Sequence, residues 1–145
     1  MQYLIDGYNL LFFHLTPDED LKKNREELIS LLDKKFKALS IKATIIFDGF
    51  NQISHHAEHQ FFETLTVIFS PKSQTADEYI IERVSCAKKP NEIIVVTADK
   101  NLAQNARNLG AHSKSPKSFL KEISNKQSKK ELQEKVDVKI KELDD

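Results

Sequence analysis

Short hydrophobic runs recur along the chain and alternate with longer segments of helical periodicity. The runs occupy residues 2–5, 43–47, 65–69 and 93–96, and residues 111–113 are a weaker fifth candidate. Runs without alternating polar positions are typical of strands that are buried on both faces. The pattern therefore predicts an α/β fold, a three-layer α/β/α sandwich with a mostly parallel sheet of four or five strands.

Helical segments are expected between these strands. The longest begins at Thr16-Pro17-Asp18 and ends near residue 39. Its hydrophobic positions recur with a period near 3.6 residues and are Leu21, Leu28, Leu31, Leu32, Phe36 and Leu39. A short apolar helix over residues 10–14 precedes it, with Asn9 as the expected N-cap. Residues 50–64 predict a polar loop.

The second half of the chain carries clear helix boundaries. Thr75 and Glu78 have the spacing of a capping box, which begins a helix that runs to about Lys89 and ends before Pro90. A further helix follows residue 99, and Gly110 closes it.

The C-terminal part predicts two helices. Ser115-Pro116 begins one that ends near Ile123, and an amphipathic helix follows Asn125. The hydrophobic positions of this second helix form a strip one residue wide and are Leu132, Val136, Ile140 and Leu143. A chain of 145 residues suits one domain. We therefore expect a domain over residues 1–124 and a charged helical tail over 125–145, which docks on the body or on a partner helix.

Composition excludes several classes of protein. Cys86 is the single cysteine, so a disulfide framework and a CxxC zinc site are excluded. No apolar run exceeds four residues, and the N-terminus lacks the basic and apolar regions of a signal peptide. These features favour a cytoplasmic protein without a membrane span or a membrane partner.

Charge is unevenly distributed, although the formal net charge is zero. Residues 1–99 carry 15 acids and 11 bases, whereas residues 114–130 carry six lysines and one acid. The basic segment is either a solvated helix end or a contact for the phosphates of a nucleic acid.

Four aspartates stand where predicted strands end or the next helix begins. Asp6, Asp48 and Asp99 follow strands, and Asp77 begins the helix after the third strand. In a parallel sheet these positions share the carboxyl edge, where doubly wound folds bind ligands. Converging carboxylates repel one another unless a cation compensates, and oxygen-only ligands suit Mg²⁺ or Mn²⁺. The pattern predicts a metal site at which a divalent cation activates water against a phosphodiester.

Helix geometry separates Asp77 from its neighbour Glu78. Asp77 shares the face of Ile80, Ile81 and Val84 that packs on the sheet, whereas Glu78 is engaged in capping. We therefore expect Asp77 to bind metal and Glu78 to support the helix. Each acid also has a purely structural alternative, because Asp-Gly is a common turn dipeptide and an aspartate at a helix start caps it or favours its dipole.

Three histidines, His55, His56 and His59, lie in the expected polar loop. The i, i+4 spacing of His55 and His59 is compatible with zinc if the loop is helical, but strong helix signals and an HExxH order are absent. A solvated loop that contacts RNA is the favoured interpretation.

Four motifs resemble those of the YacP-like NYN domain nucleases, which belong to the wider PIN-like group. In chain order they are Leu4-Ile5-Asp6-Gly7-Tyr8-Asn9-Leu10, Ile46-Phe47-Asp48-Gly49, Thr75-Ala76-Asp77-Glu78-Tyr79-Ile80 and Val95-Val96-Thr97-Ala98-Asp99-Lys100. Arg25, Gln104 and Gly110-Ala111 also resemble the family pattern, and the resemblance covers about residues 2–123. Ala98 and Ser113 depart from it, because the family more often has a serine at the first position and a basic residue near the second.

The resemblance implies a PIN-like sheet with the strand order 3-2-1-4-5 and a metal-dependent ribonuclease of bacterial RNA metabolism. The acids that it implies as catalytic metal ligands are Asp6, Asp77 and Asp99, with Asp48 as a further candidate. It also implies that Asn9 orients the first acid or its water and that Thr97 steadies the loop of Asp99.

Our leading hypothesis is a Mg²⁺- or Mn²⁺-dependent endoribonuclease that acts on single-stranded RNA, either free or associated with the ribosome. Backbone phosphates would be bound by Arg25, Lys100 and the lysines of residues 114–130, which include Lys126, Lys129 and Lys130. Tyr8 would stack on a base. The alternative is a non-catalytic RNA- or ribosome-binding module that works through the basic segment and the tail. An aspartyl-phosphate receiver or phosphatase fits less well, because it needs an acidic neighbour where Gly7 stands.

Overall fold

The computed structural model describes residues 1–14, 20–49 and 57–144, and within them it has one sheet with the strand order β3-β4-β2-β1-β5-β6. The strands are β1 (Gln2–Asp6), β2 (Ala43–Phe47), β3 (Glu58–Phe61), β4 (Leu65–Phe69), β5 (Ile93–Val96) and β6 (His112–Lys114). Every neighbouring pair is parallel except β3 and β4, which are antiparallel. The five predicted strands are present in the implied order, and β3 is an additional strand at one edge.

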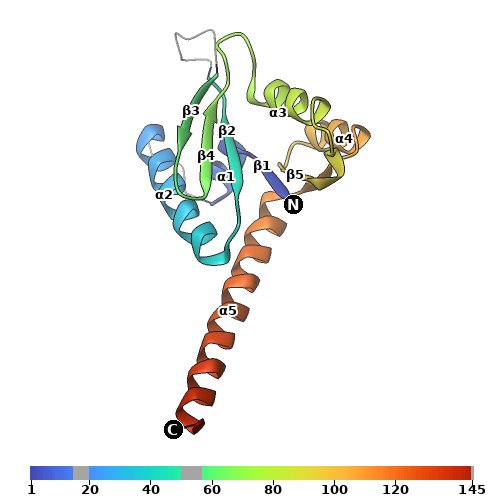
Figure 1. The fold of residues 1–145 in the computed structure, drawn as a ribbon. Coiled ribbons are helices and arrows are strands. Elements are labelled where there is room, and N and C mark those ends of the chain that lie inside the picture. Colours follow the sequence, from blue (N-terminus) through green and yellow to red (C-terminus); the bar gives the residue numbers. More distant parts are fainter. Residues whose placement is uncertain (15–19, 50–56, 145) are drawn as a thin grey trace.

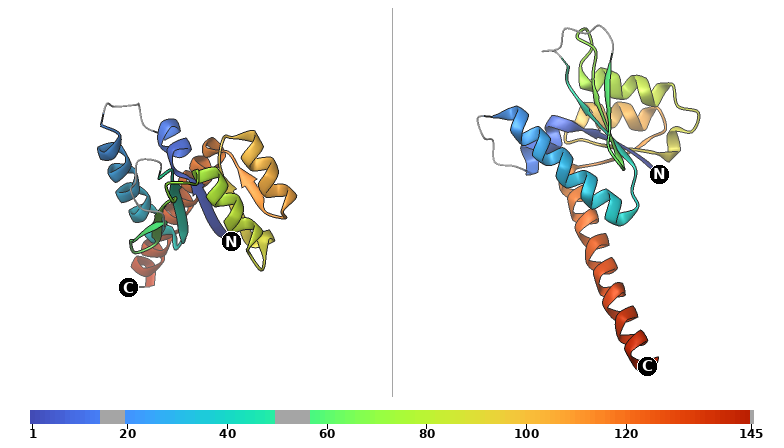
Figure 2. Two further views of the ribbon diagram at one scale, coloured as in Figure 1. Left: turned by 90° about the horizontal axis from the view of Figure 1, so that it is seen from above. Right: turned by 60° about the vertical axis from the view of Figure 1, so that its left-hand side comes forward.

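Helices cover both faces of the sheet (Figures 1 and 2). One face carries α1 (Gly7–His14), α2 (Leu21–Leu39) and the first part of α5 (Pro116–Asp144), and the other carries α3 (Ala76–Ser85) and α4 (Lys100–Asn108). Ile5 belongs to the hydrophobic core on the α2 side, and its neighbour Leu4 belongs to the core on the α3 side. Successive strand residues point to opposite faces, so the continuous apolar runs supply both cores. The predicted three-layer sandwich is confirmed.

The expectation of a polar loop over residues 50–64 is wrong for residues 58–61, which form β3. All four residues of β3 are exposed, and the strand pairs with β4 alone. An exposed edge strand needs no hydrophobic alternation, so its pattern resembles that of a loop. Residues 50–56, and with them His55 and His56, lie outside the described residues.

Helix α2 differs from its prediction in its start and in its buried face. It begins at Leu21 with Asp20 as the N-cap, whose carboxylate accepts from the Lys23 amide at 3.0 Å. The expected start at residues 16–18 lies outside the described residues. Leu21 and Leu31 are exposed, whereas Ile29 is buried beside the correctly predicted Leu28, Leu32 and Phe36. The buried face is therefore turned slightly from the predicted stripe.

Two other helix boundaries also differ. Helix α3 ends at Ser85 rather than near Lys89, and Pro90 begins a short 3₁₀ turn, η1 (Pro90–Glu92). The two helices expected after Ser115 are a single helix, α5, because nothing near Asn125 is a proline or glycine that would break it.

Helix α5 has 29 residues and is about 43 Å long, so most of it projects beyond the body (Figure 1). Ile123 is the last buried residue among the positions of α5 up to 142, and the side chains of residues 128–142 are all exposed. In the described ranges, neither α5 nor any other helix is long and apolar enough to cross a membrane.

Candidate functional site

Asp6 ends the central strand β1 and is 9% exposed. Its Oδ2 accepts a hydrogen bond from Thr97 Oγ1 at 3.0 Å, and its carboxylate also accepts from the backbone N–H of Asn9. The second contact places Asp6 as the N-cap of α1, which begins at Gly7. The expectation that Asn9 caps a helix over residues 10–14 is therefore wrong, because the acid three residues earlier already satisfies this helix end.

The loop that follows β5 is fastened to the start of α1. Thr97 Oγ1, which donates to Asp6, accepts from the Asp99 amide at 3.1 Å. Asn9 Oδ1 accepts from the Ala98 amide at 2.7 Å. Thr97 therefore joins Asp6 to the loop of Asp99. The side chain of Asn9 binds this loop and does not bind the carboxylate of Asp6.

Asp99 and Asp77 meet between the starts of α4 and α3. The Asp99 carboxylate caps α4 by accepting from the amides of Asn101 at 2.9 Å and Leu102 at 3.2 Å. The carboxyl groups of Asp77 and Asp99 share a further hydrogen bond, which requires a proton on one of them. Asp99 therefore has its structural role as a cap and also stands against a second acid.

The four aspartates influence one another's ionisation. Burial, the charge of Asp6, the hydrogen bond to Asp99 and the charges of Asp99 and Asp48 raise the pKa of Asp77 to about 6. Burial is also the main cause that raises the pKa of Asp6, and the charges of Asp99 and Asp48 act in the same direction against the hydrogen bonds from Thr97 and Asn9. The structure thus brings the four acids predicted from the strand ends to one electrostatically coupled edge.

Asp48 stands at the end of β2, where the chain is packed tightly against Ser70. The Ser70 amide donates to the Phe47 carbonyl at 3.0 Å, and the Gly49 amide donates to Ser70 Oγ at 2.9 Å. A Cβ on Gly49 would lie 1.8 Å from the Ser70 carbonyl oxygen, and one on Gly7 would lie 2.6 Å from the Phe47 ring. Both Asp-Gly pairs therefore owe their glycine to close packing. Sequence patterns gave no signal for Ser70.

The capping box at the start of α3 is confirmed. Thr75 Oγ1 accepts from the Glu78 amide and donates to Glu78 Oε1, both at 3.2 Å. Glu78 is exposed, whereas Asp77 is half-buried and shares its hydrogen bond with Asp99. The two neighbouring acids therefore point to different surroundings.

We expect Glu78→Gln to be a mild change in any activity of this edge and in stability, because glutamine also serves in a capping box. Thermal unfolding and RNA cleavage by Glu78→Gln, measured beside Asp77→Asn, check this assignment. A loss of cleavage for Glu78→Gln as large as that for Asp77→Asn would mean that the roles of these two acids are reversed.

Two residues expected to bind RNA are held in an aromatic cluster. The Arg25 guanidinium lies 5.0 Å from the Phe69 ring centroid and 5.8 Å from that of Phe47, and its Nη1 donates to the Tyr8 hydroxyl at 3.0 Å. Tyr8 is half-buried, with its ring edge-on to Phe47 at 4.9 Å and stacked with Phe12 at 5.9 Å. Both side chains are thus engaged within the protein next to Asp6.

The expected phosphate-binding lysines divide between two edges of the sheet. Lys100 is exposed at the start of α4, directly after Asp99. Lys126 pairs with Glu122 at 3.2 Å near the amino end of β1, and Lys130 binds the Ala38 carbonyl at the end of α2. Lys129 is exposed one residue before Lys130. The three tail lysines therefore lie on the side of the molecule opposite the four aspartates.

The family more often has a basic residue near the position of Ser113, and in the structure a basic side chain does lie beside Ser113. Arg107 of α4 donates to Ser113 Oγ and, at 3.0 Å, to Gln104 Oε1. The basic group thus comes from the neighbouring helix rather than from the strand position itself.

The four aspartates suit a hard divalent cation, since such cations prefer carboxylate oxygens and the like charges of these carboxylates repel one another. As the side chains stand, no three acids, histidines or cysteines among the described residues are grouped closely enough to hold a metal ion. The Asp99 carboxylate accepts from the amides of α4, and the Asp6 carboxylate accepts from Thr97. His59 lies in β3 stacked on Phe61 at 6.1 Å, so the helical spacing required for a zinc pair does not extend to it.

The raised pKa of Asp77 predicts how the metal-free protein responds to pH. Between about pH 4 and pH 6 the folded chain holds a proton on Asp77 that the unfolded chain has released, so stability increases as the pH falls through this window. Asp77→Asn should reduce this dependence, to which Asp6 also contributes through its raised pKa, and should raise the free energy of unfolding at pH 7.5 by about 1–2 kcal/mol, after allowance for screening by water at this half-buried residue. Urea unfolding in EDTA at pH 4.5 and 7.5 measures the effect.

Glu58→Gln on the exposed strand β3 serves as the matched control, because it also removes one carboxylate. If Asp77→Asn kept the wild-type difference between the two pH values, the coupling of these acids would be wrong.

Comparison with known proteins identifies the family. A family model described as the YacP-like NYN domain matches residues 3–144. A crystal structure of Rae1 (YacP) from Bacillus subtilis has a TM-score of 0.65 and 23% identity, and the match covers 99% of this chain and 84% of that chain. A mutant of the same protein has a TM-score of 0.67 and 23% identity, with coverage of 88% and 77%. No curated protein matches.

The matched family is one of nuclease-like, RNA-related domains, and the match covers all four motifs and, apart from Gln2, all six strands. The chain therefore belongs to the YacP-like NYN domain family.

Proposed function

We propose that this protein is a divalent-metal-dependent endoribonuclease that hydrolyses phosphodiester bonds in single-stranded RNA at the carboxyl edge of its sheet. The observation that carries the proposal is the coupling of Asp77 to Asp6, Asp99 and Asp48, which raises the pKa of Asp77 to about 6. Carboxylates crowded in this way cost stability, and such arrangements concentrate at functional sites. Family membership supports an RNA-related nuclease as the class of activity.

The proposed cofactor is Mg²⁺ or Mn²⁺, held by Asp6, Asp77 and Asp99 with Asp48 as a further ligand. When bound, such a cation lowers the pKa of water and neutralises charge on a phosphoryl oxygen. Its charge would also favour the ionised form of Asp77.

The residues of the chain keep these acids in position. Thr97 and the Asn9 amide hold the Asp6 carboxylate at the end of β1, and the Asn9 side chain holds the loop that leads to Asp99. In the metal-free protein the raised pKa keeps a proton on Asp77 up to about pH 6, and this proton has to leave before the carboxylate binds a cation. Lys100, exposed beside Asp99, is placed to contact a backbone phosphate.

Cleavage of a labelled, unstructured RNA by the purified full-length chain tests this function. We expect cleavage in Mg²⁺ or Mn²⁺ and none in EDTA, with activity restored when the cation is added back. Binding of RNA without cleavage under every metal condition would support the non-catalytic RNA- or ribosome-binding module instead. If RNA is cleaved equally well in EDTA, the proposed metal dependence is wrong.

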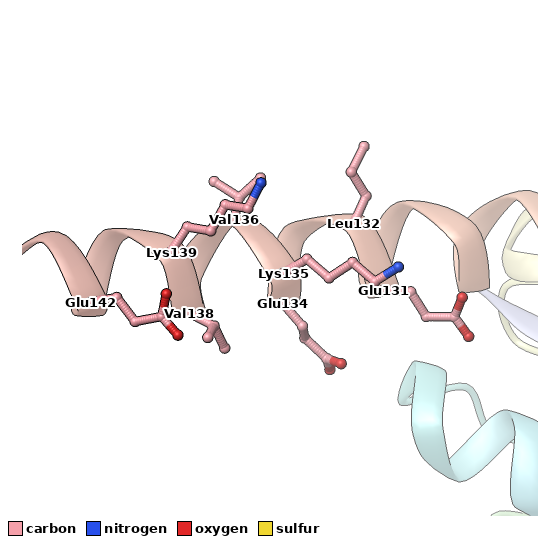
Figure 3. A pocket seen from close by; sticks show the side chains of 8 residues that line it. All are labelled: Glu131, Leu132, Glu134, Lys135, Val136, Val138, Lys139 and Glu142. Atoms are coloured by element: carbon pink, nitrogen blue, oxygen red, sulfur yellow. The ribbon is translucent and has the colours of Figure 1, made fainter.

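We further propose that residues 1–124 form the nuclease domain and that residues 125–145 form a tail. The end of core burial at Ile123 supports this boundary, although α5 continues through it. Figure 3 shows that Leu132 and Val136 project from the same side of the tail, whereas Val138 projects from the opposite side with Glu134. The exposed apolar residues are therefore not confined to the single strip expected from the sequence.

The tail lysines give a salt-dependent prediction. Replacing Lys126, Lys129 and Lys130 with glutamine should weaken RNA binding and should flatten the slope of log affinity against log salt by up to about 2, since each lost phosphate contact contributes about 0.7. The ion pair of Lys126 and the carbonyl contact of Lys130 compete with RNA, so Lys129 is expected to contribute most. Fluorescence anisotropy at several salt concentrations measures the slope.

Replacing Lys135, Lys139 and Lys141 with glutamine is the matched control, because these lysines lie farther along the same helix. An unchanged slope for the first variant would place the phosphate contacts near Arg25 and Lys100 instead. Truncation after Gln127 should leave unfolding cooperative and the metal dependence unchanged, since the described side chains that it removes are exposed.

A further inference from the structure

A continuous series of aromatic rings leads from the core to the surface beside the acidic edge. Phe69 stacks with Phe47 at 5.7 Å, Phe47 meets Tyr8 edge-on at 4.9 Å, and Tyr8 stacks with Phe12 at 5.9 Å with an angle of 20° between the ring planes. Phe47 is fully buried, Tyr8 is half-buried and Phe12 is 56% exposed. The series therefore ends in an exposed phenylalanine that is supported from below.

Arg25 holds the inner part of this series in place. Its guanidinium lies over the rings of Phe69 and Phe47, and it donates a hydrogen bond to the Tyr8 hydroxyl. A cation over the inner rings and a fixed hydroxyl restrict the orientation of Tyr8, and Tyr8 in turn supports one face of Phe12. An exposed ring that is fixed in this way loses little conformational entropy when a flat ligand stacks on it.

Phe12 lies a short distance from the acidic edge, in the helix that begins directly after Asp6. Phe12 follows Asp6 by six residues within the helix that Asp6 caps, so it lies about 9 Å along the helix axis from that acid. Stacked nucleotides rise about 3.4 Å each along a strand, so this distance corresponds to two or three nucleotides. An RNA phosphate at Asp6 would therefore have a base within reach of Phe12.

We infer that Phe12 is a stacking platform for an unpaired base of the RNA substrate, two or three nucleotides from the phosphate bound at the acidic edge. The inference rests on the proposed function and deepens it, because it assigns to Phe12 the base contact that the sequence suggested for Tyr8. Tyr8 acts as the support, since its ring already contacts Phe47 and Phe12. A stacking platform accepts any base, so the contact selects for unpaired RNA rather than for a sequence.

The test measures binding in Ca²⁺, because a divalent cation is needed to hold a phosphate at the acidic edge and Ca²⁺ also takes carboxylate oxygens as ligands. The probe is a single-stranded RNA that carries 2-aminopurine at successive positions, and a denaturing gel checks that it stays intact. We expect the wild-type protein to quench 2-aminopurine fluorescence at one or two neighbouring positions. Phe12→Ala should abolish this quenching and weaken binding roughly 5- to 100-fold, the range for loss of one base–aromatic stack. The salt slope of binding should not change, because no phosphate contact is lost.

Two further variants separate stacking from a structural role. Phe12→Trp keeps an aromatic face and should retain both quenching and affinity, whereas Phe12→Leu keeps the apolar bulk and should lose the quenching. Phe61→Ala is the matched control, because Phe61 is 76% exposed but lies in β3 opposite Thr66, toward the amino edge of the sheet. It should bind RNA as the wild type does.

The outcomes distinguish this inference from the proposed nuclease activity. Wild-type affinity and quenching in Phe12→Ala would overturn the inference, even if the protein cleaves RNA. A second comparison uses an RNA with abasic sites at the quenched positions. If Phe12→Ala weakened binding of this RNA as much as it weakens binding of the intact RNA, the inference would also be overturned, because the effect would not depend on a base. Position-specific quenching that depends on Phe12 would support the stacking role even if no cleavage is detected in any metal.

Discussion

Replacement of any one of Asp6, Asp77 and Asp99 with asparagine is expected to reduce RNA cleavage in Mg²⁺ by roughly 10²–10³-fold without unfolding the protein. An amide is nearly isosteric with a carboxylate but is a poor ligand for Mg²⁺. The asparagine carbonyl is still able to accept from Thr97 at position 6, and asparagine is a good N-cap at position 99. Loss of one negative charge also relieves repulsion among the acids, so metal-free stability should hold or increase.

Initial cleavage rates at saturating Mg²⁺, together with thermal unfolding in EDTA, measure the two effects separately. Asp137→Asn on the exposed tail is the control, because it makes the same chemical change far from the acidic edge. Wild-type rates in all three variants would refute the proposed metal site. A variant that loses both activity and cooperative unfolding would instead show a structural role for that acid.

Gly49→Ala is expected to destabilise the protein by about 3 kcal/mol or more, the upper end of the range for forced overpacking. A Cβ at this position would lie 1.8 Å from the Ser70 carbonyl oxygen, and both neighbouring segments are backbone that cannot rotate away. The chain would have to separate the end of β2 from the loop after β4. The Gly49 amide would then lose its hydrogen bond to Ser70 Oγ, and Asp48 would move with it.

Urea unfolding of Gly49→Ala gives the free energy, and Lys72→Ala in the same loop region is a control with an exposed side chain. Ser70→Ala causes no overpacking but removes both hydrogen bonds of Ser70 Oγ, the one from the Gly49 amide and the one to the Gln74 carbonyl, and should cost about 2 kcal/mol. A surface substitution usually changes the free energy of unfolding by less than about 0.5 kcal/mol. A change for Gly49→Ala no larger than this would contradict the close packing.

Local sequence patterns predicted most helices and strands, because the signal for each of these elements lies in the residues of that element itself. The runs at 43–47, 65–69 and 93–96 are buried on both faces, and a strand of this kind carries its signal in every position. The Thr75–Glu78 capping box and the Gly110 helix end were also correct, since both involve contacts within a few residues. Exposed β3 carried no such signal and was missed.

The sequence by itself determined the α/β alternation, the order of the buried strands through the family resemblance, and the four aspartates at the carboxyl edge, because strand ends in a parallel sheet share one edge. Only the tertiary structure decided which atoms these residues contact. It made Asp6 rather than Asn9 the cap of α1, directed Asn9 to Ala98, and placed the tail lysines away from the acids. It also put Phe12, rather than Tyr8, at the surface end of the aromatic series. These features join residues that are distant in the chain, or they depend on which face of a helix is covered by another element. Local periodicity indicates neither which distant residues meet nor which face is covered.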